Sequence, residues 1–116
     1  MSAGGHAVVP RRGEVWWASL DPTQGSEIRK TRPCLVLSAN ALNRLRSTVI
    51  VVPLSTAAQA HPPVTVAVGC RQRDAVAVID QVRAVAKHRL REKVETASDE
   101  DMGKVLAAHA RVLEMR

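Results

Sequence analysis

Three polar side chains stand at the ends of apolar segments, where a folded chain can present them to a ligand. Arg32 precedes the apolar run 34–37, and Ser55 and Thr56 follow the run 49–54. A guanidinium can hold two phosphate oxygens at once and stays charged. A hydroxyl can donate a hydrogen bond to a further oxygen. These residue types therefore suit binding of a phosphate group and stabilisation of negative charge that develops on it.

The same three residues also have common structural roles. Arg32 can be a surface arginine paired with a carboxylate, a contact that contributes little. Ser55 or Thr56 can cap the turn after its strand through a side-chain-to-backbone hydrogen bond. On spacing alone the structural roles are the more frequent ones, so both interpretations stay open.

Short strands are the main elements that must position these residues. Residues 12–20 alternate, which predicts a strand that ends at the Asp21-Pro22 step. The runs 34–37 and 49–54 are continuously apolar, as expected of strands buried on both faces. One face of the first strand would carry Val15, Trp17 and Ser19, and the other Trp16, Ala18 and Leu20.

Later segments complete a β-rich pattern. Residues 64–68 alternate and follow two prolines, and residues 75–79 read as a strand that runs on through Val85. The polar segment 40–47 between strands predicts a connection with one helical turn. Five or more short strands in so small a chain predict a compact barrel or half-barrel.

The C-terminal part predicts a helix. Ser98 can cap its first turn, and acidic residues 99–101 favour the positive end of the helix dipole. Apolar positions then recur at helical spacing, which predicts an amphipathic helix that closes the barrel or packs at a subunit contact. They are Met102, Val105, Leu106, His109, Val112 and Leu113.

Charge points to a polyanionic or acidic partner. The 116 residues carry a formal charge of +6, and no acidic residue occurs between Glu27 and Asp74. A basic run fills that interval, while acids collect at residues 92–101. Only 2% of the residues are aromatic, which argues against modules that bind single-stranded RNA on an aromatic face. The basic residues are Arg29, Lys30, Arg32, Arg44, Arg46, Arg71 and Arg73.

Length and cysteine content bound the remaining possibilities. We expect a loose tail over residues 1–10 and one domain over 11–116, which would gain buried surface as a homodimer. Cys34 and Cys70 are too few for a disulfide scaffold, so a reducing compartment fits best. No signal-peptide core or segment able to span a membrane is present, and we expect a cytoplasmic protein.

Histidines do not supply an acid and base pair. His6 lies in the tail, His61 precedes two prolines, His88 follows a lysine, and His109 belongs to the predicted helix. Structural or solvated roles are therefore the more frequent readings of each. No metal-ligand spacing occurs either, so we expect neither a metal nor a cofactor.

Taken in order, five segments resemble one family of small bacterial proteins, the MazF/PemK/Kid toxins, which are endoribonucleases neutralised by an antitoxin. The resemblance covers nearly the whole chain and implies a mostly β fold with a C-terminal helix, a small SH3-like barrel of the PemK/CcdB toxin type. The segments are residues 12–17, 21–27, 31–38, 49–56 and 73–83, which read RGEVWW, DPTQGSE, TRPCLVLS, VIVVPLST and RDAVAVIDQVR.

The resemblance also implies an activity and partners. It implies the toxin of a type II toxin-antitoxin system that cleaves single-stranded RNA at a short sequence without a metal. The expected products carry a 2′,3′-cyclic phosphate and a 5′-hydroxyl. Such toxins work as homodimers and bind a cognate antitoxin whose acidic, disordered tail occupies the RNA groove. The basic charge of this chain favours a tail of that kind.

The resemblance implies a role for each residue of this chain that matches a functional position of the family. The resemblance implies that Arg32 is catalytic, that Ser55 binds the scissile phosphate, and that Glu27 assists proton transfer; an ion pair with Arg29 or Lys30 is the structural alternative for Glu27. The Asp-Gln step would contribute to the wall of the active site. The residues expected to contact RNA are Ser26, Arg29, Lys30, Thr56, Asp80 and Gln81.

The sequence departs from the usual family pattern at two places, and two alternative functions stay open. Ser55 stands where threonine is more usual, and the loop 27–32 lacks a glycine that relatives often carry, so we expect a changed RNA sequence preference. A gyrase poison like CcdB on the same fold would need a Trp-Gly-Ile ending, which residues 112–116 do not match. A non-catalytic RNA-binding or regulatory module is the other alternative, and the presence of both Arg32 and Ser55 counts against it.

Overall fold

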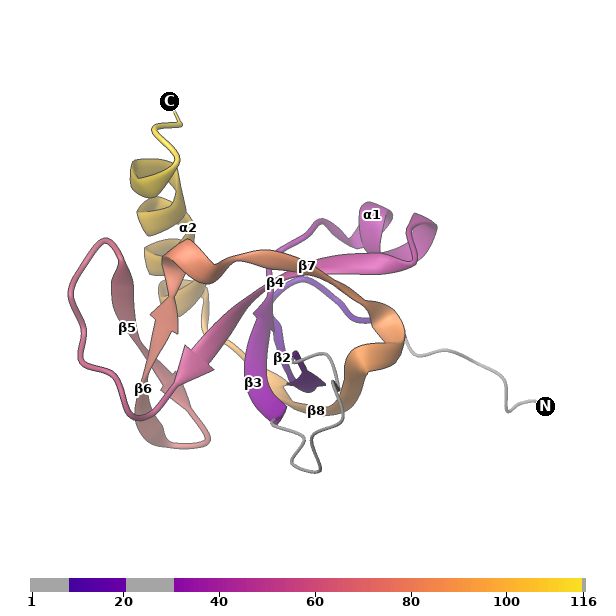
Figure 1. Ribbon diagram of the computed structural model, residues 1–116, viewed down its shortest axis with the longest axis horizontal. Helices are drawn as coiled ribbons and strands as arrows, with labels where there is room; N and C mark the ends of the chain where they lie inside the picture. Colours follow the sequence, from indigo (N-terminus) through magenta and orange to yellow (C-terminus); the bar gives the residue numbers. More distant parts are fainter. Residues whose placement is uncertain (1–8, 21–30, 116) are drawn as a thin grey trace, which may run out of the picture.

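A curled antiparallel sheet makes up most of the molecule. The computed structural model describes residues 9–20 and 31–115, and within them seven strands form one sheet (Figure 1). Their order is β5-β6-β4-β3-β2-β8, with β7 also paired to β4. The strands are β2 (Glu14–Ser19), β3 (Thr31–Val36), β4 (Thr48–Ser55), β5 (Thr65–Cys70), β6 (Arg73–Val78), β7 (Arg83–Ala86) and β8 (Leu90–Thr96).

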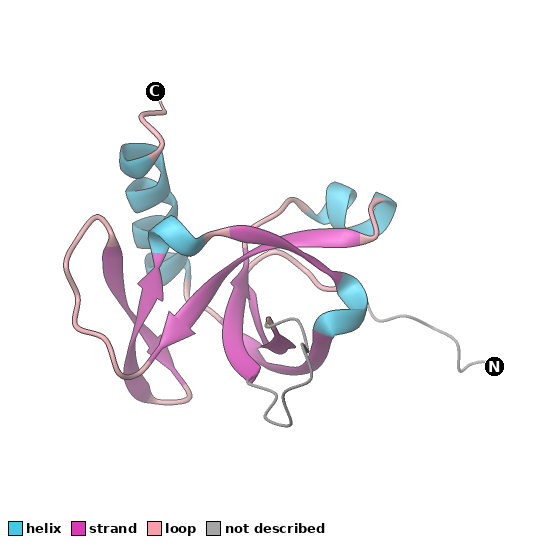
Figure 2. Cartoon of the chain, viewed as in Figure 1, coloured by secondary structure: helices cyan, strands magenta, loops and turns pink. Residues whose placement is uncertain are grey.

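Strand β4 is the element around which the sheet curls. Its residues 48–51 pair with β7, its residues 51–53 pair with β3, and its last two residues pair with β6. Strand β4 therefore belongs to two parts of the sheet, and the sheet curls into a half-barrel (Figure 2). The predicted mostly β fold with a C-terminal helix is confirmed.

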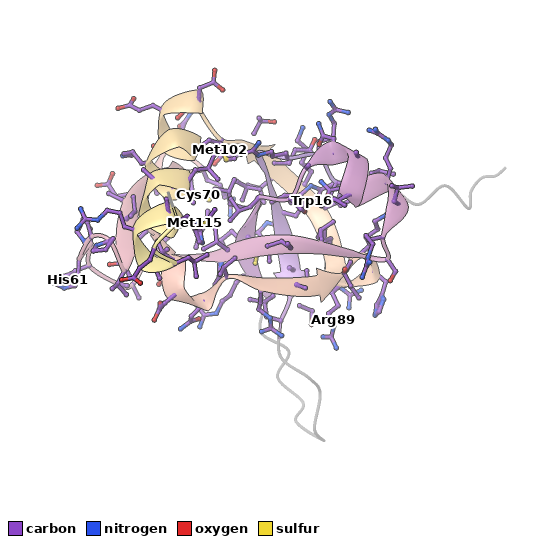
Figure 3. The ribbon with its side chains drawn as sticks, turned by 90° about the horizontal axis from the view of Figure 1, so that it is seen from above. Trp16, His61, Cys70, Arg89, Met102 and Met115 are labelled. Carbon is purple, nitrogen blue, oxygen red and sulfur yellow. The ribbon has the colours of Figure 1, made fainter. Side chains whose placement is uncertain are left out.

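Two apolar clusters pack on the two faces of the sheet. Alternation along β2 sends Val15 into one cluster and Trp16 with Ala18 into the other, as predicted. Figure 3 shows Trp16 in the interior of the molecule. The cluster of Val15 also takes in Val105 and Ala108 from the C-terminal helix.

The C-terminal helix α2 (Asp99–Val112) begins as predicted. The Ser98 hydroxyl accepts a hydrogen bond of 3.0 Å from the Asp101 N–H, which satisfies one free amide of the first turn. Helix α2 packs against β5 and the 3₁₀ turn η1 (Ile79–Gln81). Of the predicted apolar face, Leu106 and Leu113 remain 37% and 57% exposed. None of the helices in the described residues is long and apolar enough to cross a membrane.

A buried polar network anchors the short helix α1 (Asn40–Leu45), which lies in the segment predicted to be a connection with one helical turn. The Asn43 side chain is fully buried, and its amide N–H donates to the Ser38 carbonyl at 3.0 Å. The Ser38 hydroxyl donates to the Asn43 carboxamide oxygen and accepts from the Ile50 N–H. These bonds tie α1 to β4.

One prediction about the strands was wrong, and one strand was not predicted. The segment 75–85 is not one strand, because β6 and β7 pair with different parts of β4 and the turn η1 carries the chain from one to the other. Strand β8 was not predicted, since its sequence is largely charged. It pairs with β2 at the end of the sheet, where one edge faces solvent and charged side chains are tolerated.

Candidate functional site

A hollow of about 590 Å³ lies where β3 begins and β4 ends. In Figure 1 the start of β3 and the end of β4 lie toward the lower edge of the view, near the turn between β5 and β6. Arg32, Ser55 and Thr56 all line it, so three of the predicted site residues lie together. The other lining residues are Trp17, Thr31, Pro33, Leu54, Ala57, Cys70, Arg71 and Arg73.

Strand register explains why Arg32 and Ser55 meet. Strand β3 pairs antiparallel with β4, with Cys34 opposite Pro53. Continuing this register by two residues brings Arg32 level with Ser55, on the same side of the two strands. Arg32 is also paired with Ala18 on the other side, so its backbone is held between two strands. The side chain itself is exposed to solvent.

The Ser55 hydroxyl makes one of the bonds expected of a turn residue. Its oxygen accepts a hydrogen bond of 3.2 Å from the Ala57 N–H. That contact uses a lone pair and leaves the hydroxyl proton able to donate. The structural role that the sequence left open is therefore compatible with phosphate binding, because the capping contact also orients the hydroxyl.

Positive charge gathers at the hollow. Arg32, Arg71 and Arg73 are exposed on its lining, and none of the described residues that line it is acidic. Asp74 instead lines a neighbouring hollow beside α2. Such an arrangement attracts phosphate groups. Arg44 and Arg46 of the predicted basic run are not among the residues that line the hollow beside Arg32, since Arg44 belongs to α1 and Arg46 lines another hollow beside α1.

Trp17 and Arg71 are lining residues that the sequence analysis did not assign to the site. The Arg71 guanidinium carbon lies 5.8 Å from the centroid of the Trp17 ring, within the range of a cation–π contact. Trp17 is opposite Pro33 on β3, and Pro33 is level with Leu54 in the register of β3 with β4. These three side chains form an apolar floor, with Arg71 above its aromatic end.

Arg71 sits on an unusual turn. Arg71 and Gln72 join β5 to β6 with φ angles of 55° and 62°, which is the left-handed conformation that glycine and asparagine prefer in such two-residue hairpins. The Arg71 N–H donates a 2.8 Å hydrogen bond to the Glu95 carboxylate on β8. A sequence signal for this turn was absent, because neither residue is glycine, asparagine or aspartate.

Neither cysteine is suited to act as a nucleophile. Burial raises the pKa of Cys34 to about 12, against the opposing charges of Arg83 and Arg32. Burial also raises the pKa of Cys70, and the neighbouring Glu95 carboxylate adds to that effect. Both thiols are therefore protonated at neutral pH. The effect of Arg83 on Cys34 places another positive charge near the β3 strand.

Histidines lie away from the hollow in the described residues. His61 is exposed at one end of the molecule, on the segment before β5 (Figure 3), and His88 is exposed on the 3₁₀ turn η2 (Lys87–Arg89). His109 is buried on α2, with Nδ1 3.0 Å from the Val105 carbonyl oxygen. Across the described ranges, no group of three or more His, Cys, Asp or Glu side chains is arranged to hold a metal ion.

Other predicted residues do not reach the hollow or cannot be placed. Asp80 and Gln81 lie exposed on η1 and are not among its lining residues. Four further predicted residues fall outside the described part of the chain. These are Ser26, Glu27, Arg29 and Lys30.

The chain is similar to several known proteins. Residues 11–113 match the model of a family described as PemK-like, MazF-like toxins of type II toxin-antitoxin systems. The chain is 35% identical over 103 residues to endoribonuclease EndoA of Bacillus subtilis, an alignment that covers 84% of this chain and 89% of EndoA. It is 38% identical over 78 residues to endoribonuclease toxin MazF of Escherichia coli, covering 67% of this chain and 69% of that protein.

A solved structure shares the fold. It is an endoribonuclease in complex with its cognate antitoxin from a mycobacterial species, with a TM-score of 0.76 and 25% identity. The match covers 92% of this chain and 97% of that one. The curled sheet and single long helix are therefore common to both proteins.

Proposed function

Because the chain belongs to the PemK-like, MazF-like family of type II toxin-antitoxin toxins, we propose that it is an endoribonuclease whose hollow binds the scissile phosphate of single-stranded RNA. The observation that carries this proposal is the position of Arg32 level with Ser55 on a surface lined by three arginines. The endoribonucleases EndoA and MazF named above give the reaction class.

The proposed chemistry is cleavage by the 2′-hydroxyl of the substrate itself. That oxygen attacks the adjacent phosphorus and the bond to the 5′-oxygen breaks, which leaves a 2′,3′-cyclic phosphate and a 5′-hydroxyl. Negative charge grows on the phosphorane, and Arg32 would stabilise it with two parallel hydrogen bonds. The Ser55 hydroxyl would donate a hydrogen bond to a phosphate oxygen, with Thr56 beside it. No metal is needed for these steps.

Proton transfer is assigned by resemblance. The 2′-hydroxyl must lose a proton and the departing oxygen must gain one. Glu27 is the carboxylate that we propose for this task, from the segment before β3. The neighbouring Ser26, Arg29 and Lys30 would contact the RNA chain, as would Asp80 and Gln81 beyond the hollow.

The same hollow suits an antitoxin. The mycobacterial relative was solved with its cognate antitoxin, and we propose that this chain likewise binds an antitoxin with an acidic, disordered tail. Carboxylates of that tail would compete with RNA phosphates for Arg32, Arg71 and Arg73. We further propose that the protein works as a homodimer in the cytoplasm, where its RNA substrate is found.

One experiment tests the proposed reaction. Purified protein is incubated with a long RNA in EDTA, and the new 5′ ends are mapped by ligation with and without prior phosphorylation. We expect cuts at one short sequence, with ends that ligate only after phosphorylation because they carry a 5′-hydroxyl. Ends that ligate directly, or cleavage that requires added divalent metal, would contradict the proposal. An antitoxin partner is tested separately by competition with RNA.

A further inference from the structure

We propose that Trp17 and Arg71 form a nucleobase-binding site beside the phosphate site, in which one base stacks between the indole ring and the guanidinium group. This inference rests on the proposed function, since it concerns the same RNA substrate. It assigns to Trp17 and Arg71 a role in binding a base, which the phosphate chemistry does not supply.

The position of Trp17 suits a base next to the cleaved bond. Trp17 is opposite Pro33 in the pairing of β2 with β3, and Pro33 is the chain neighbour of Arg32. The ring is only partly buried and lines the hollow, whereas the adjacent Trp16 is 7% exposed and belongs to the core. Trp17 and Arg32 both line the hollow, so a phosphate held by Arg32 places a flanking base within reach of Trp17.

The distance between the Trp17 ring and the Arg71 guanidinium is close to the distance needed to hold one base between them. The Arg71 guanidinium lies 5.8 Å from the Trp17 ring centroid. A base between two planar groups needs about 7 Å between them, since stacked bases are about 3.4 Å apart. Arg71 is exposed on a turn, so its side chain can move outward by the roughly 1 Å required. Both indole and guanidinium groups stack well on bases.

The backbone under Arg71 is held in a costly conformation. Two consecutive non-glycine residues adopt positive φ angles, which L-residues avoid. The Glu95 carboxylate accepts the Arg71 N–H at 2.8 Å and fixes the turn against β8. A glycine-containing turn would join the strands with less strain, but it would not carry a guanidinium over Trp17. Strain of this kind is common where a side chain has a binding role.

Binding of non-cleavable oligonucleotides tests the proposal. The probes are short 2′-O-methyl RNAs, which lack the attacking hydroxyl, and abasic oligonucleotides of equal length. We expect the base-bearing probes to quench the fluorescence of Trp17, and Trp17→Phe to remove that quenching. Trp17→Leu and Arg71→Ala should each weaken binding of the base-bearing probes by about 5- to 100-fold. Trp17→Leu should leave binding of the abasic probe unchanged, and Trp17→Phe should retain most affinity.

Control variants distinguish a loss of base stacking from a loss of positive charge and from a loss of the folded structure. Arg44→Ala removes an exposed arginine from α1 and should weaken both probes slightly and equally. Arg71→Lys keeps the charge but not the planar group, so it should bind base-bearing probes less well than wild type. If circular dichroism shows that Trp17→Leu does not fold, the Arg71 variants test the proposal in its place. Equal loss for base-bearing and abasic probes in every variant would overturn the proposal.

Glu95 provides a test of positioning. Glu95→Ala removes the acceptor for the Arg71 N–H, and we expect a higher KM for RNA with little change in kcat, whereas Glu95→Gln keeps an acceptor oxygen and should restore most of the affinity. Equal KM for both variants and wild type would contradict the role of the turn. Failure of the proposed function has a different signature, namely no RNA cleavage while the preference for base-bearing probes persists.

Discussion

Arg32 lies level with Ser55 on two neighbouring strands, although 22 positions of chain separate them. The pairing of β3 with β4 sets this relationship, and the pairing of β3 with β2 keeps it rigid. A guanidinium and a hydroxyl are thereby held on one side of the sheet, at the mouth of a hollow without acidic lining among the described residues.

Ser55 should contribute less to cleavage than Arg32. Ser55→Ala removes the hydroxyl that we expect to bind the phosphate, but Thr56 lies next to it on the hollow and can partly replace it. We expect a fall in single-turnover rate of about 10-fold. Ser55→Thr keeps the hydroxyl and should retain most of the rate. A rate for Ser55→Thr as low as that of Ser55→Ala would show that the hydroxyl is not the important group.

Binding of RNA should weaken steeply with salt. Each phosphate contact to a single strand contributes a slope of about 0.7 in log affinity against log salt concentration. Arg73→Ala should therefore lower the slope by about that amount, because Arg73 lines the hollow. Arg44→Ala on α1 is the matched control and should leave the slope nearly unchanged. Fluorescence titrations with a 2′-O-methyl RNA at several salt concentrations provide the measurement.

The turn between β5 and β6 should be a site where stability can be gained. Gln72 has a φ of 62°, and glycine adopts this conformation without steric cost. Gln72→Gly should raise the free energy of unfolding by about 0.5–1 kcal/mol, as measured by urea denaturation. Gln72→Ala keeps the β-carbon and should give no gain. A gain of equal size in both variants would point to a cause other than backbone conformation.

Glu14 should stabilise the fold only above acidic pH. Burial alone would raise its pKa, but hydrogen bonds from the Arg11 N–H and the Trp16 indole N–H, together with the ion pair to Lys93, outweigh burial and lower it. A carboxylate with a lowered pKa contributes stability above the ordinary glutamate pKa and loses it as the pH falls through the folded-state value.

The variant Glu14→Gln makes this measurable. At pH 7 it should reduce the free energy of unfolding by about 1 kcal/mol, the net value of a charged hydrogen bond or ion pair of this kind. The difference from wild type should narrow as the pH is lowered below the ordinary glutamate pKa. A difference that stays constant down to pH 3 would mean that the charge of Glu14 does not matter.

Sequence reasoning identified the polar residues at the strand ends that line the hollow better than the side chains around them. Arg32 and Ser55 could be predicted because each adjoins a continuous apolar run, a signal that follows directly from burial. The role of Trp17 could not, because alternation along β2 places it on the same face as the core residue Val15. Its exposure depends on where the sheet ends, which only tertiary pairing decides.

A largely charged strand and a buried polar side chain were the other features that the sequence could not predict. Strand β8 carries too few apolar residues to be predicted, yet it supplies Glu95, which fixes the Arg71 turn. The buried Asn43 also reads as part of a polar connection, because nothing local indicates that Ser38 and Ile50 satisfy its hydrogen bonds. Both features depend on contacts between residues distant in sequence.

The most direct test of the account is single-turnover cleavage of RNA in EDTA by Arg32→Ala, beside Arg32→Lys, His61→Ala, His88→Ala and wild type. Removing a group that stabilises developing charge typically lowers the rate by about 10²–10³-fold. We expect Arg32→Ala to lose that much while circular dichroism shows an intact fold, and Arg32→Lys to recover little, since lysine lacks the planar fork. The histidine variants should retain most activity. If Arg32→Ala cleaves RNA near the wild-type rate while a histidine variant is inactive, the assigned site is wrong.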